Sequence, residues 1–316
     1  MKLFPIALGC MGMSRMYGHA DEDESIATIK AALDHGINLI DTGDFYGTGH
    51  NEMLIGRAIH GRRDEAMLSV KFGALRGPGG EWLGIDTRPV AIKNFLAQSL
   101  TRLGVEYIDI YRPSRLDPAV PIEDTVGTIA DLIKAGYVRQ VGLSEVGVET
   151  IRRAHGVHPI HDLQIEYSLI SRSPEQKIFP ALDELRIAVT AYGVLSRGLL
   201  SGSLPAGKSD LRAHLPRFSG DNLTRNRVLI ERLNAAAKNR GITPTQLAIA
   251  WVMAKKPTIV PVIGARTRTQ LVEALGALEV KLTPAEVKSI EDAVPTGEVA
   301  GTRYAEPQMA QLDSER

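Results

Sequence analysis

The sequence predicts an α/β fold, a (β/α)8 TIM barrel that forms one domain over residues 1–316. Two observations predict it: short apolar segments alternate with amphipathic helical segments, and eight of the apolar segments have the length of strands. A chain of 316 residues also has a length at which α/β barrels commonly form one domain. The expected strands span residues 6–9, 37–41, 67–71, 107–111, 138–143, 162–166, 187–191 and 258–262.

Amphipathic segments fill the gaps between these strands. In the first of them, residues 23–35, the apolar side chains of Ile26, Ile29 and Leu33 return at helical spacing and form one face. Several expected helices are followed by a glycine, as Gly104 follows residues 89–103, where the left-handed conformation that ends a helix is favourable. The other expected helices span residues 122–135, 148–154, 175–185, 245–254, 269–278 and 284–293.

Two segments break this alternation. Residues 196–223 contain four glycines and two prolines, so we expect a long loop, and a loop of that length in a compact domain is more often functional than idle. Residues 295–316 are polar and show no periodicity, and we expect the end of the chain to be mobile.

Composition limits the class of protein. Lys plus Arg equals Asp plus Glu at 37 each, so the zero net charge gives no support for a nucleic-acid or membrane-surface partner. Cys10 is the only cysteine, which excludes an internal disulfide and fits a reducing compartment. No apolar run approaches the roughly 18 residues of a membrane span. We therefore expect a soluble, cytoplasmic protein that acts on a small molecule, with no metal site.

Polar residues end two of the expected strands, Asp41 after residues 37–40 and Lys71 after residues 67–70, and Tyr46 follows in a loop flanked by glycines. In a barrel of parallel strands the chemistry is placed at this carboxyl edge. The phenol of a free tyrosine titrates near pH ~10. A nearby ammonium favours the phenolate and lowers that pKa, while a carboxylate keeps the ammonium charged. The three residues therefore predict a proton donor, Tyr46, assisted by Lys71 and Asp41.

The chain closely resembles the aldo-keto reductase family from about residue 6 to residue 295, most of all the bacterial and plant-type oxidoreductases that share the GCMGMS opening. The resemblance implies NADP(H)-dependent reduction of an aldehyde or ketone to the alcohol, with Tyr46 as general acid. The motifs that carry it are GCMGMS (9–14), DTGDFYG (41–47), VKFG (70–73), GLSE (142–145), QIEYS (164–168), AYGVLSRG (191–198) and PVIGART (261–267).

The chain departs from the family at Ser114, where relatives usually carry a histidine that orients the carbonyl group of the substrate. A serine hydroxyl can donate one hydrogen bond but cannot become cationic. Loss of an oxyanion donor costs roughly 3 kcal/mol in the transition state. Either Ser114, Arg112 or a water supplies the contact, or the substrate is an aldehyde, quinone or activated ketone that needs less help.

The remaining site residues follow from the resemblance. Ser144 and Gln164 match residues that bind the nicotinamide carboxamide, and Tyr192 matches the aromatic residue that stacks on the ring, whereas Glu145 replaces a common family asparagine. Arg266 and Arg268 favour a 2′-phosphate, hence NADPH over NADH. The expected cofactor-binding residues are Met13, Ser144, Gln164, Tyr192, Gly193, Leu195, Arg197, Gly198, Gly264, Arg266 and Gln270.

Aromatic and apolar residues in loops at the catalytic edge are candidates for the substrate wall; they are Met13, Tyr17, Phe45, Trp82 and Phe218. Two other functions stay open at this point. One is a non-catalytic nicotinamide-binding subunit that senses redox state. The other is an isomerase or aldolase in which Lys71 forms a Schiff base. The natural substrate, the favoured direction and the oligomeric state do not follow from the sequence.

Overall fold

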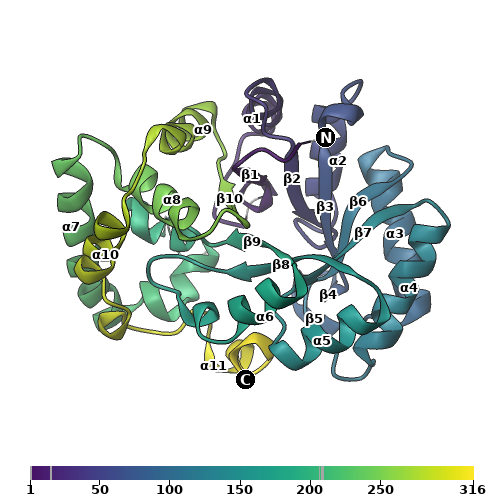
Figure 1. The fold of residues 1–316 in the computed structure, drawn as a ribbon. Helices are drawn as coiled ribbons and strands as arrows, with labels where there is room; N and C mark the ends of the chain where they lie inside the picture. The colour runs from purple at the N-terminus through teal and green to yellow at the C-terminus, as the bar shows by residue number, and fades with distance from the viewer. Residues whose placement is uncertain (1, 15, 206, 208–209) are drawn as a thin grey trace.

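The computed structural model describes residues 2–14, 16–205, 207 and 210–316, and within them eight parallel strands form a closed barrel (Figure 1). Around the barrel the strands follow the order β1-β10-β9-β8-β7-β6-β3-β2. Their bounds are β1 (Ala7–Gly9), β2 (Leu39–Gly43), β3 (Met67–Phe72), β6 (Ile108–Pro113), β7 (Val138–Ser144), β8 (Ile160–Glu166), β9 (Ala188–Tyr192) and β10 (Ile259–Gly264).

All eight expected strands are confirmed, and so is the TIM-barrel fold. The largest displacement is that of β2, which begins and ends two residues later than expected. Asp41 therefore stands in the middle of the strand rather than after it, paired in register with Gly9 and Ser69. Because successive side chains of a strand point to opposite faces, the choice of register decides which residues enter the barrel.

Alternate residues of the strands fill the barrel interior in layers. One layer is apolar and contains Ala7, Leu39, Ile110, Val260 and Val262. Two residues further along β2 and β6 the interior becomes polar with Asp41 and Arg112. The fully buried Arg112 pairs with Asp162 of β8 at 3.0 Å. Gly142 of β7 makes room for this pair, since a Cβ there would lie 3.0 Å from the guanidinium carbon of Arg112.

Helices surround the barrel (Figure 1). The expected helices are all present, although residues 175–177 and 276–278 lie outside the α-helices. Two further long helices, α2 and α7, and the short α11 were not expected. The bounds are α1 (Glu22–Asp34), α2 (His50–Ile59), α3 (Pro89–Leu103), α4 (Ile122–Lys134), α5 (Val148–Val157), α6 (Ile178–Leu185), α7 (Gly220–Asn239), α8 (Pro244–Lys255), α9 (Arg268–Leu275), α10 (Pro284–Ala293) and α11 (Glu306–Met309).

Two insertions depart from the simple barrel. An antiparallel hairpin, β4 (Ala74–Arg76) and β5 (Trp82–Ile85), follows β3 and was not expected. The expected loop at 196–223 contains three short 3₁₀ segments, Ser196–Ser201, Leu211–His214 and Pro216–Phe218, and its last residues already belong to α7. Residues 206, 208 and 209 of this loop lie outside the described part of the chain.

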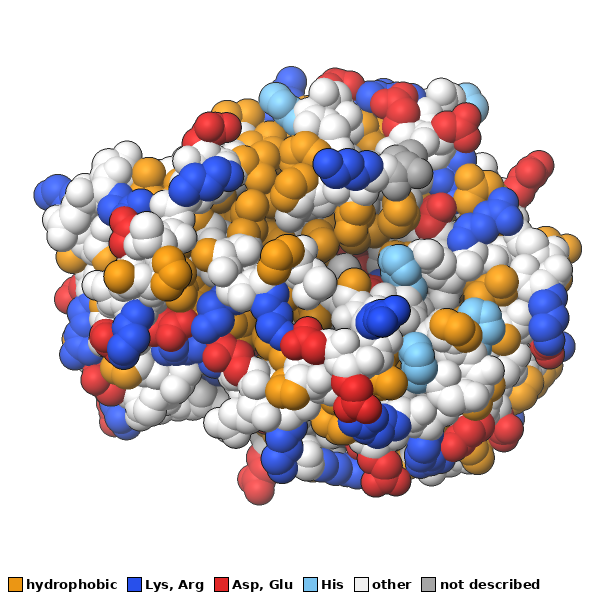
Figure 2. Space-filling model, in the orientation of Figure 1, with side chains coloured by type: hydrophobic (Ala, Val, Ile, Leu, Met, Phe, Trp, Pro, Cys, Tyr) orange, Lys and Arg blue, Asp and Glu red, His pale blue; other side chains and the backbone are white. Residues whose placement is uncertain are grey.

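Basic and acidic side chains are interspersed over the face shown in Figure 2, and apolar side chains gather near its middle. This mixture agrees with the equal numbers of basic and acidic residues. Among the described residues, the helices are all too short or too polar to span a bilayer.

Two helical glycines provide a matched test of the packing. A Cβ on Gly56 of α2 would lie 2.6 Å from the carbonyl oxygen of Leu103, whereas a Cβ on Gly127 of α4 would meet no atom within 4 Å. We expect Gly56→Ala to lower the free energy of unfolding by about 1–3 kcal/mol through overpacking. Gly127→Ala should raise it by about 0.5–1 kcal/mol, because alanine has the better helix propensity. Urea denaturation measures both, and equal effects of the two substitutions would contradict this packing.

Candidate active site

A cavity of about 1010 Å³ opens at the carboxyl ends of the barrel strands. Each strand contributes a lining residue near its carboxyl end or directly after it. These residues are Gly9, Asp41, Lys71, Ser114, Ser144, Gln164, Tyr192 and Gly264, in the order β1, β2, β3, β6, β7, β8, β9, β10. The carboxyl edge of a parallel barrel is where active sites are built.

Almost every residue expected from the sequence lines this cavity, including all four expected catalytic residues. The exception among the cofactor-binding residues is Met13. Its side chain is buried in the apolar core between the barrel and the helices, and its neighbours Met11 and Gly12 line the cavity instead.

Asp41 and Lys71 form a buried ion pair at the floor of the cavity. The Lys71 Nζ lies 2.5 Å from Asp41 Oδ1, and each residue is 4% exposed. The other carboxylate oxygen, Oδ2, accepts hydrogen bonds from Ser69 Oγ at 2.9 Å and from Gln164 Nε2 at 2.7 Å. Burial lowers the pKa of Lys71, and the Asp41 charge only partly opposes this effect. The carboxylate is thus fully hydrogen-bonded and fixes the ammonium in one position.

Tyr46 lies directly above this pair. The Lys71 Nζ is 5.2 Å from the centre of the Tyr46 ring, and the ring of Phe45 packs edge-on against it at 4.8 Å. The loop that carries Tyr46 is anchored by Asn51, which accepts from Thr42 Oγ1 at 2.7 Å and donates to the carbonyl oxygen of Cys10 at 2.8 Å. These contacts bind the loop to the ends of β1 and β2.

The expectation of a lowered pKa for Tyr46 is wrong as a net effect. Burial raises the pKa of Tyr46 well above its ordinary value, and the negative charge of Asp41 raises it further. The sequence showed the neighbouring ammonium but not the depth of burial, which dominates. The phenol therefore holds its proton at neutral pH.

Of the two side chains expected to contact a carbonyl oxygen, Ser114 and Arg112, only Ser114 lines the cavity. Arg112 is fully buried inside the barrel, where it donates to Asp162 and to Ser69, so it cannot reach the cavity. Ser114 lines the cavity, and its hydroxyl has no hydrogen-bond partner among the described residues. Ser114 is therefore free to donate to a ligand, which Arg112 is not.

The residues expected around a nicotinamide ring are brought together. Ser144 and Gln164 are paired neighbours on β7 and β8, and the buried Ser144 hydroxyl lacks a partner within the described chain. Tyr192 lines the cavity while its hydroxyl donates to Glu145 at 2.7 Å. Glu145 itself is fully buried and accepts from Arg303, Ser314 and the backbone N–H of Glu166. Protein groups saturate its carboxylate, so Glu145 is not free to bind a nicotinamide carboxamide.

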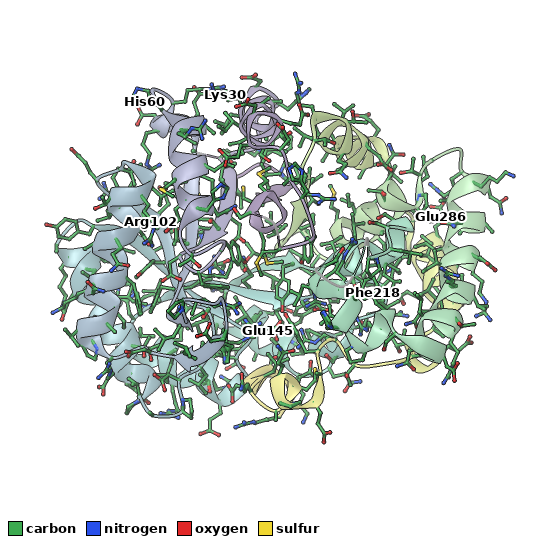
Figure 3. All side chains as sticks on the ribbon, turned by 180° about the vertical axis from the view of Figure 1, so that it is seen from behind. Lys30, His60, Arg102, Glu145, Phe218 and Glu286 are labelled. Carbon is green, nitrogen blue, oxygen red and sulfur yellow. The ribbon has the colours of Figure 1, made fainter. Side chains whose placement is uncertain are left out.

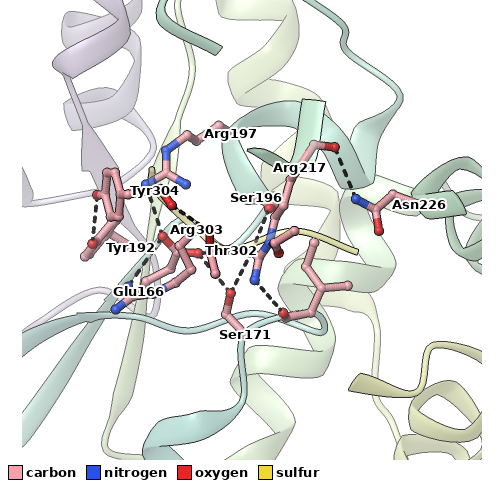
Figure 4. A network of polar contacts seen from close by, with 12 residues as sticks. Glu166, Ser171, Tyr192, Ser196, Arg197, Arg217, Asn226, Thr302, Arg303 and Tyr304 are labelled. Atoms are coloured by element: carbon pink, nitrogen blue, oxygen red, sulfur yellow. Dashed lines mark hydrogen bonds and ion pairs between the residues drawn. The ribbon is translucent and has the colours of Figure 1, made fainter. Parts of the chain in front are cut away.

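The segment after β9 carries the residues expected around a pyrophosphate. Gly193, Arg197 and Gly198 all have positive φ angles of 67°, 56° and 93°, so the backbone turns sharply along the cavity wall, where Leu195 also lies. The Arg197 guanidinium does not point to solvent. It pairs with Glu166 at 3.1 Å and lies 4.5 Å from the centre of the Tyr304 ring (Figure 4).

At the end of β10 only one of the two expected arginines is available. Arg268 is bound to Glu24 at 2.8 Å on the surface of α1. Arg266 donates to the carbonyl oxygens of Tyr17 and His19, and it forms no ion pair within the described residues. Gly264, Arg266 and Gln270 line the cavity, and Gln270 accepts from the Arg266 backbone N–H at 2.8 Å.

Some of the residues expected in the substrate wall line the cavity, and others are buried in the core. Tyr17, Phe45 and Trp82 line the cavity, and Trp82 reaches it from the β4–β5 hairpin. Phe218 belongs to the buried core instead.

The C-terminal segment, residues 300–316, contributes to the cavity wall, which the sequence did not predict. Arg303 holds this segment with two 2.9 Å bonds to Glu145, which lies near the centre of the molecule (Figure 3). Tyr304 then enters the cavity beside Tyr192 and Arg197 (Figure 4), and residues after it, such as Gln308, complete the wall. The expected mobile end is instead fixed by charged contacts, as far as Ser314 and Glu315.

Nearby arginines lower the pKa values of the buried acidic groups around this segment. Burial alone would raise the pKa of Glu145, but the Arg303 charge and hydrogen bonds hold it well below its usual range. Burial would likewise raise the pKa of Tyr304, yet Arg197 and Arg115 outweigh burial and lower it. Polar residues without periodicity gave no sign of this role; the Arg303–Tyr304 pair near a glycine was the only local feature.

Comparison with known proteins agrees with this geometry. The model of the Aldo/keto reductase family matches residues 5–295. The chain belongs to the aldo/keto reductase family. The match covers every strand of the barrel, so the barrel is that of a family of oxidoreductases.

Individual relatives cover nearly the whole of this aldo/keto reductase. It is 40% identical to a protein of Glycine max named probable aldo-keto reductase 1, over 95% of this chain and 88% of the relative. It is 38% identical to the aldo-keto reductase yakc [NADP(+)] of Schizosaccharomyces pombe, over 95% and 91%. The structure of the glycerol dehydrogenase AKR11B4 of Gluconobacter oxydans superimposes with a TM-score of 0.83 at 32% identity, over 93% and 92%.

A buried carboxyl group in the Tyr46 loop of this aldo/keto reductase predicts a pH dependence of stability. Burial, assisted by the charge of Glu52, raises the pKa of Asp44 to about 7. An unfolded aspartate titrates near about 3.9, so the folded state binds the proton more tightly. The resulting stabilisation is complete below about pH 4 and is lost as the pH rises through about 7.

We therefore expect the unfolding free energy of the wild type, relative to Asp44→Asn, to fall between pH 4 and pH 7 by up to about 4 kcal/mol. Urea denaturation of both proteins across this range measures the difference. A difference that does not change with pH would contradict the raised pKa.

Proposed function

We propose that this aldo/keto reductase uses NADPH to reduce an aldehyde or ketone to the alcohol, with Tyr46 as the general acid. One observation carries the proposal: the buried Asp41–Lys71 pair lies directly beneath the Tyr46 ring in the cavity at the carboxyl edge of the barrel. A proton donor, a fixed positive charge and space for two ligands are what carbonyl reduction requires.

The residues around the cavity fit a nicotinamide cofactor. The unpartnered Ser144 hydroxyl and the Gln164 amide would hold the carboxamide, and Tyr192 would support the ring. Arg266, whose charge has no carboxylate partner among the described residues, would bind the 2′-phosphate that distinguishes NADPH from NADH. The relative from Schizosaccharomyces pombe, whose name includes NADP(+), supports the same preference. Bound in this way, the cofactor supplies the hydride that reduces the carbonyl carbon.

The protein supplies the proton. Tyr46 stays protonated because burial raises its pKa, and it gives its proton to the carbonyl oxygen as the carbon is reduced. The phenolate left on Tyr46 is stabilised by the Lys71 ammonium, which Asp41 holds in place. The raised pKa keeps the proton on Tyr46 until hydride addition turns the carbonyl oxygen into an alkoxide, which is a stronger base than the phenolate, and the ion pair limits the cost of that phenolate.

Ser114 determines how electrophilic the carbonyl group of the substrate must be. Its free hydroxyl would donate one neutral hydrogen bond to the carbonyl oxygen in place of the family histidine. A weaker donor suits a carbonyl group that is already electrophilic. We propose aldehydes and activated ketones as the better substrates, reduced in a reducing compartment such as the cytoplasm, where the buried, free Cys10 stays a thiol.

The two other functions make different predictions for the same site. A redox-sensing subunit would bind NADPH without turnover. A Schiff-base enzyme would need Lys71 as a neutral amine; burial acts in that direction, while the 2.5 Å contact with Asp41 opposes it. Borohydride treatment in the presence of an aldehyde distinguishes this case, because only a Schiff base leaves a covalent adduct on Lys71.

The first test removes the proton donor. We expect Tyr46→Phe to lower kcat for aldehyde reduction by at least about 100-fold, the usual worth of a general acid. The dissociation constant of NADPH, from fluorescence titration, should change little. Tyr137→Phe, at an exposed tyrosine far from the cavity lining, is the matched control. Full turnover by Tyr46→Phe would show that another group donates the proton.

The second test addresses the choice of cofactor. Arg266→Ala should weaken NADPH by about tenfold or more relative to NADH, since a charge-assisted hydrogen bond to phosphate contributes about 1.5–3 kcal/mol. Arg268→Ala, which removes an arginine already paired with Glu24, should not change the ratio of the two dissociation constants. Equal losses of NADPH and NADH in Arg266→Ala would rule out the phosphate contact.

A further inference from the structure

The positive charges that line the cavity are not all compensated. Within the described part of the chain, six basic side chains line it: Lys71, Arg76, Arg115, Arg197, Arg212 and Arg266. Three of them form ion pairs: Lys71 with Asp41 at 2.5 Å, Arg197 with Glu166 at 3.1 Å and Arg212 with Asp210 at 2.7 Å. The other three, Arg76, Arg115 and Arg266, form no ion pair with any described residue. A charge taken out of water is costly unless a partner compensates it.

Arg115 and Arg266 lie on opposite sides of the barrel. Arg266 follows β10 and Arg115 follows β6, and these strands are four places apart in the closed ring of eight. Arg115 is instead close to β3, the neighbour of β6, which carries Lys71. Arg266 thus serves the side proposed for the cofactor phosphate, whereas Arg115 belongs to the side of the proton donor.

Electrostatic effects agree with this position. Burial raises the pKa of Tyr46 and lowers that of Lys71, and the positive charge of Arg115 acts on both groups, favouring the phenolate and opposing the ammonium. Arg115 is therefore near the reacting groups, and it directly follows Ser114 in the chain.

Arg115 has no direct contact with a described carboxylate; the negative charge of Glu145 acts on it only from beyond ion-pair distance, and Glu145 is already paired with Arg303 at 2.9 Å. Its Nη1 donates to the Ser114 carbonyl oxygen at 2.6 Å, and its Nη2 lies 3.4 Å from the Tyr304 hydroxyl. Neither acceptor is a carboxylate, and together they use two of the five N–H groups of a guanidinium. Tyr304 is itself fixed by the 3.2 Å contact with Tyr192 (Figure 4), so the C-terminal segment holds Arg115 from the other side.

Arg76 is a different case. It lies on the β4–β5 hairpin, with its guanidinium 5.2 Å from the centre of the Trp82 ring and a 3.3 Å bond to the Gly80 carbonyl oxygen. The ring face partly compensates this charge. Arg115, by contrast, is 6.0 Å from the Tyr304 ring centre, at the limit of such an interaction.

We propose that Arg115 binds a carboxylate of the substrate, so that the preferred substrates are aldehydes or ketones that also carry a carboxylate group. A guanidinium presents parallel N–H groups that match the two oxygens of a carboxylate, and one positive charge compensates one negative charge. The inference rests on the proposed function for the reaction itself, but the binding of a carboxylate can be measured without turnover.

The kinetic test compares a matched pair of substrates, 4-carboxybenzaldehyde and its methyl ester, at saturating NADPH. We expect the wild type to show the higher kcat/KM for the acid. Arg115→Met should lower the acid-to-ester ratio of kcat/KM by about tenfold or more, and Arg115→Lys should retain part of the preference. Arg227→Met, at an exposed arginine of α7, is the control and should keep the wild-type ratio.

A wild type that prefers the ester, or an Arg115→Met variant with an unchanged ratio, would overturn the inference while leaving carbonyl reduction intact. Calorimetry supplies the independent arm, with benzoate and benzamide titrated into the NADP⁺-saturated protein. We expect tighter binding of benzoate in the wild type and loss of that difference in Arg115→Met. This result without turnover of either aldehyde would refute the proposed reduction but keep the carboxylate site; equal binding of benzoate and benzamide would refute the site.

Discussion

The active site depends on one buried ion pair, Asp41–Lys71. Two charges that are almost fully removed from water each carry a desolvation cost of several kcal/mol, which their contact must offset. The 2.5 Å pairing does so only because Ser69 and Gln164 satisfy the second carboxylate oxygen. Ser69 also accepts from Arg112, so the pair is connected to the Arg112–Asp162 pair in the barrel interior. The two proposed catalytic groups, Asp41 and Lys71, are thereby fixed by contacts from four different strands.

A second set of charges closes the cavity from outside the barrel. Glu145 and Glu166, at the ends of β7 and β8, bind arginines that come from distant parts of the chain. Glu145 binds Arg303, and Glu166 binds Arg197 and Arg217 (Figure 4). Because both carboxylates are fully buried, the arginines that reach them are held as firmly as core residues. The C-terminal segment and the segment after β9 are therefore parts of one wall, in which Tyr304 and Tyr192 are adjacent.

The sequence predicted the barrel, because buried parallel strands are short apolar runs that alternate with amphipathic helices. Asp41 and Lys71 were found because each follows an apolar strand segment, whereas Ser144 and Gln164 followed from the resemblance to the family. Contacts between residues far apart in the chain could not be predicted from the sequence. Arg303 and Glu145 are separated by 158 positions, and Arg268 and Glu24 by 244. The direction of the Tyr46 pKa shift was also missed, since it depends on burial depth rather than on which residues are neighbours.

The most direct test of the central claim is a double-mutant cycle on the Asp41–Lys71 pair, read out as the single-turnover rate of NADPH oxidation by a bound aldehyde. If the two side chains act as one unit, Asp41→Asn and Lys71→Met should each slow the chemical step, and the double variant should be about as slow as the slower single variant. Losses that multiply, or single variants that react at the wild-type rate, would contradict the account.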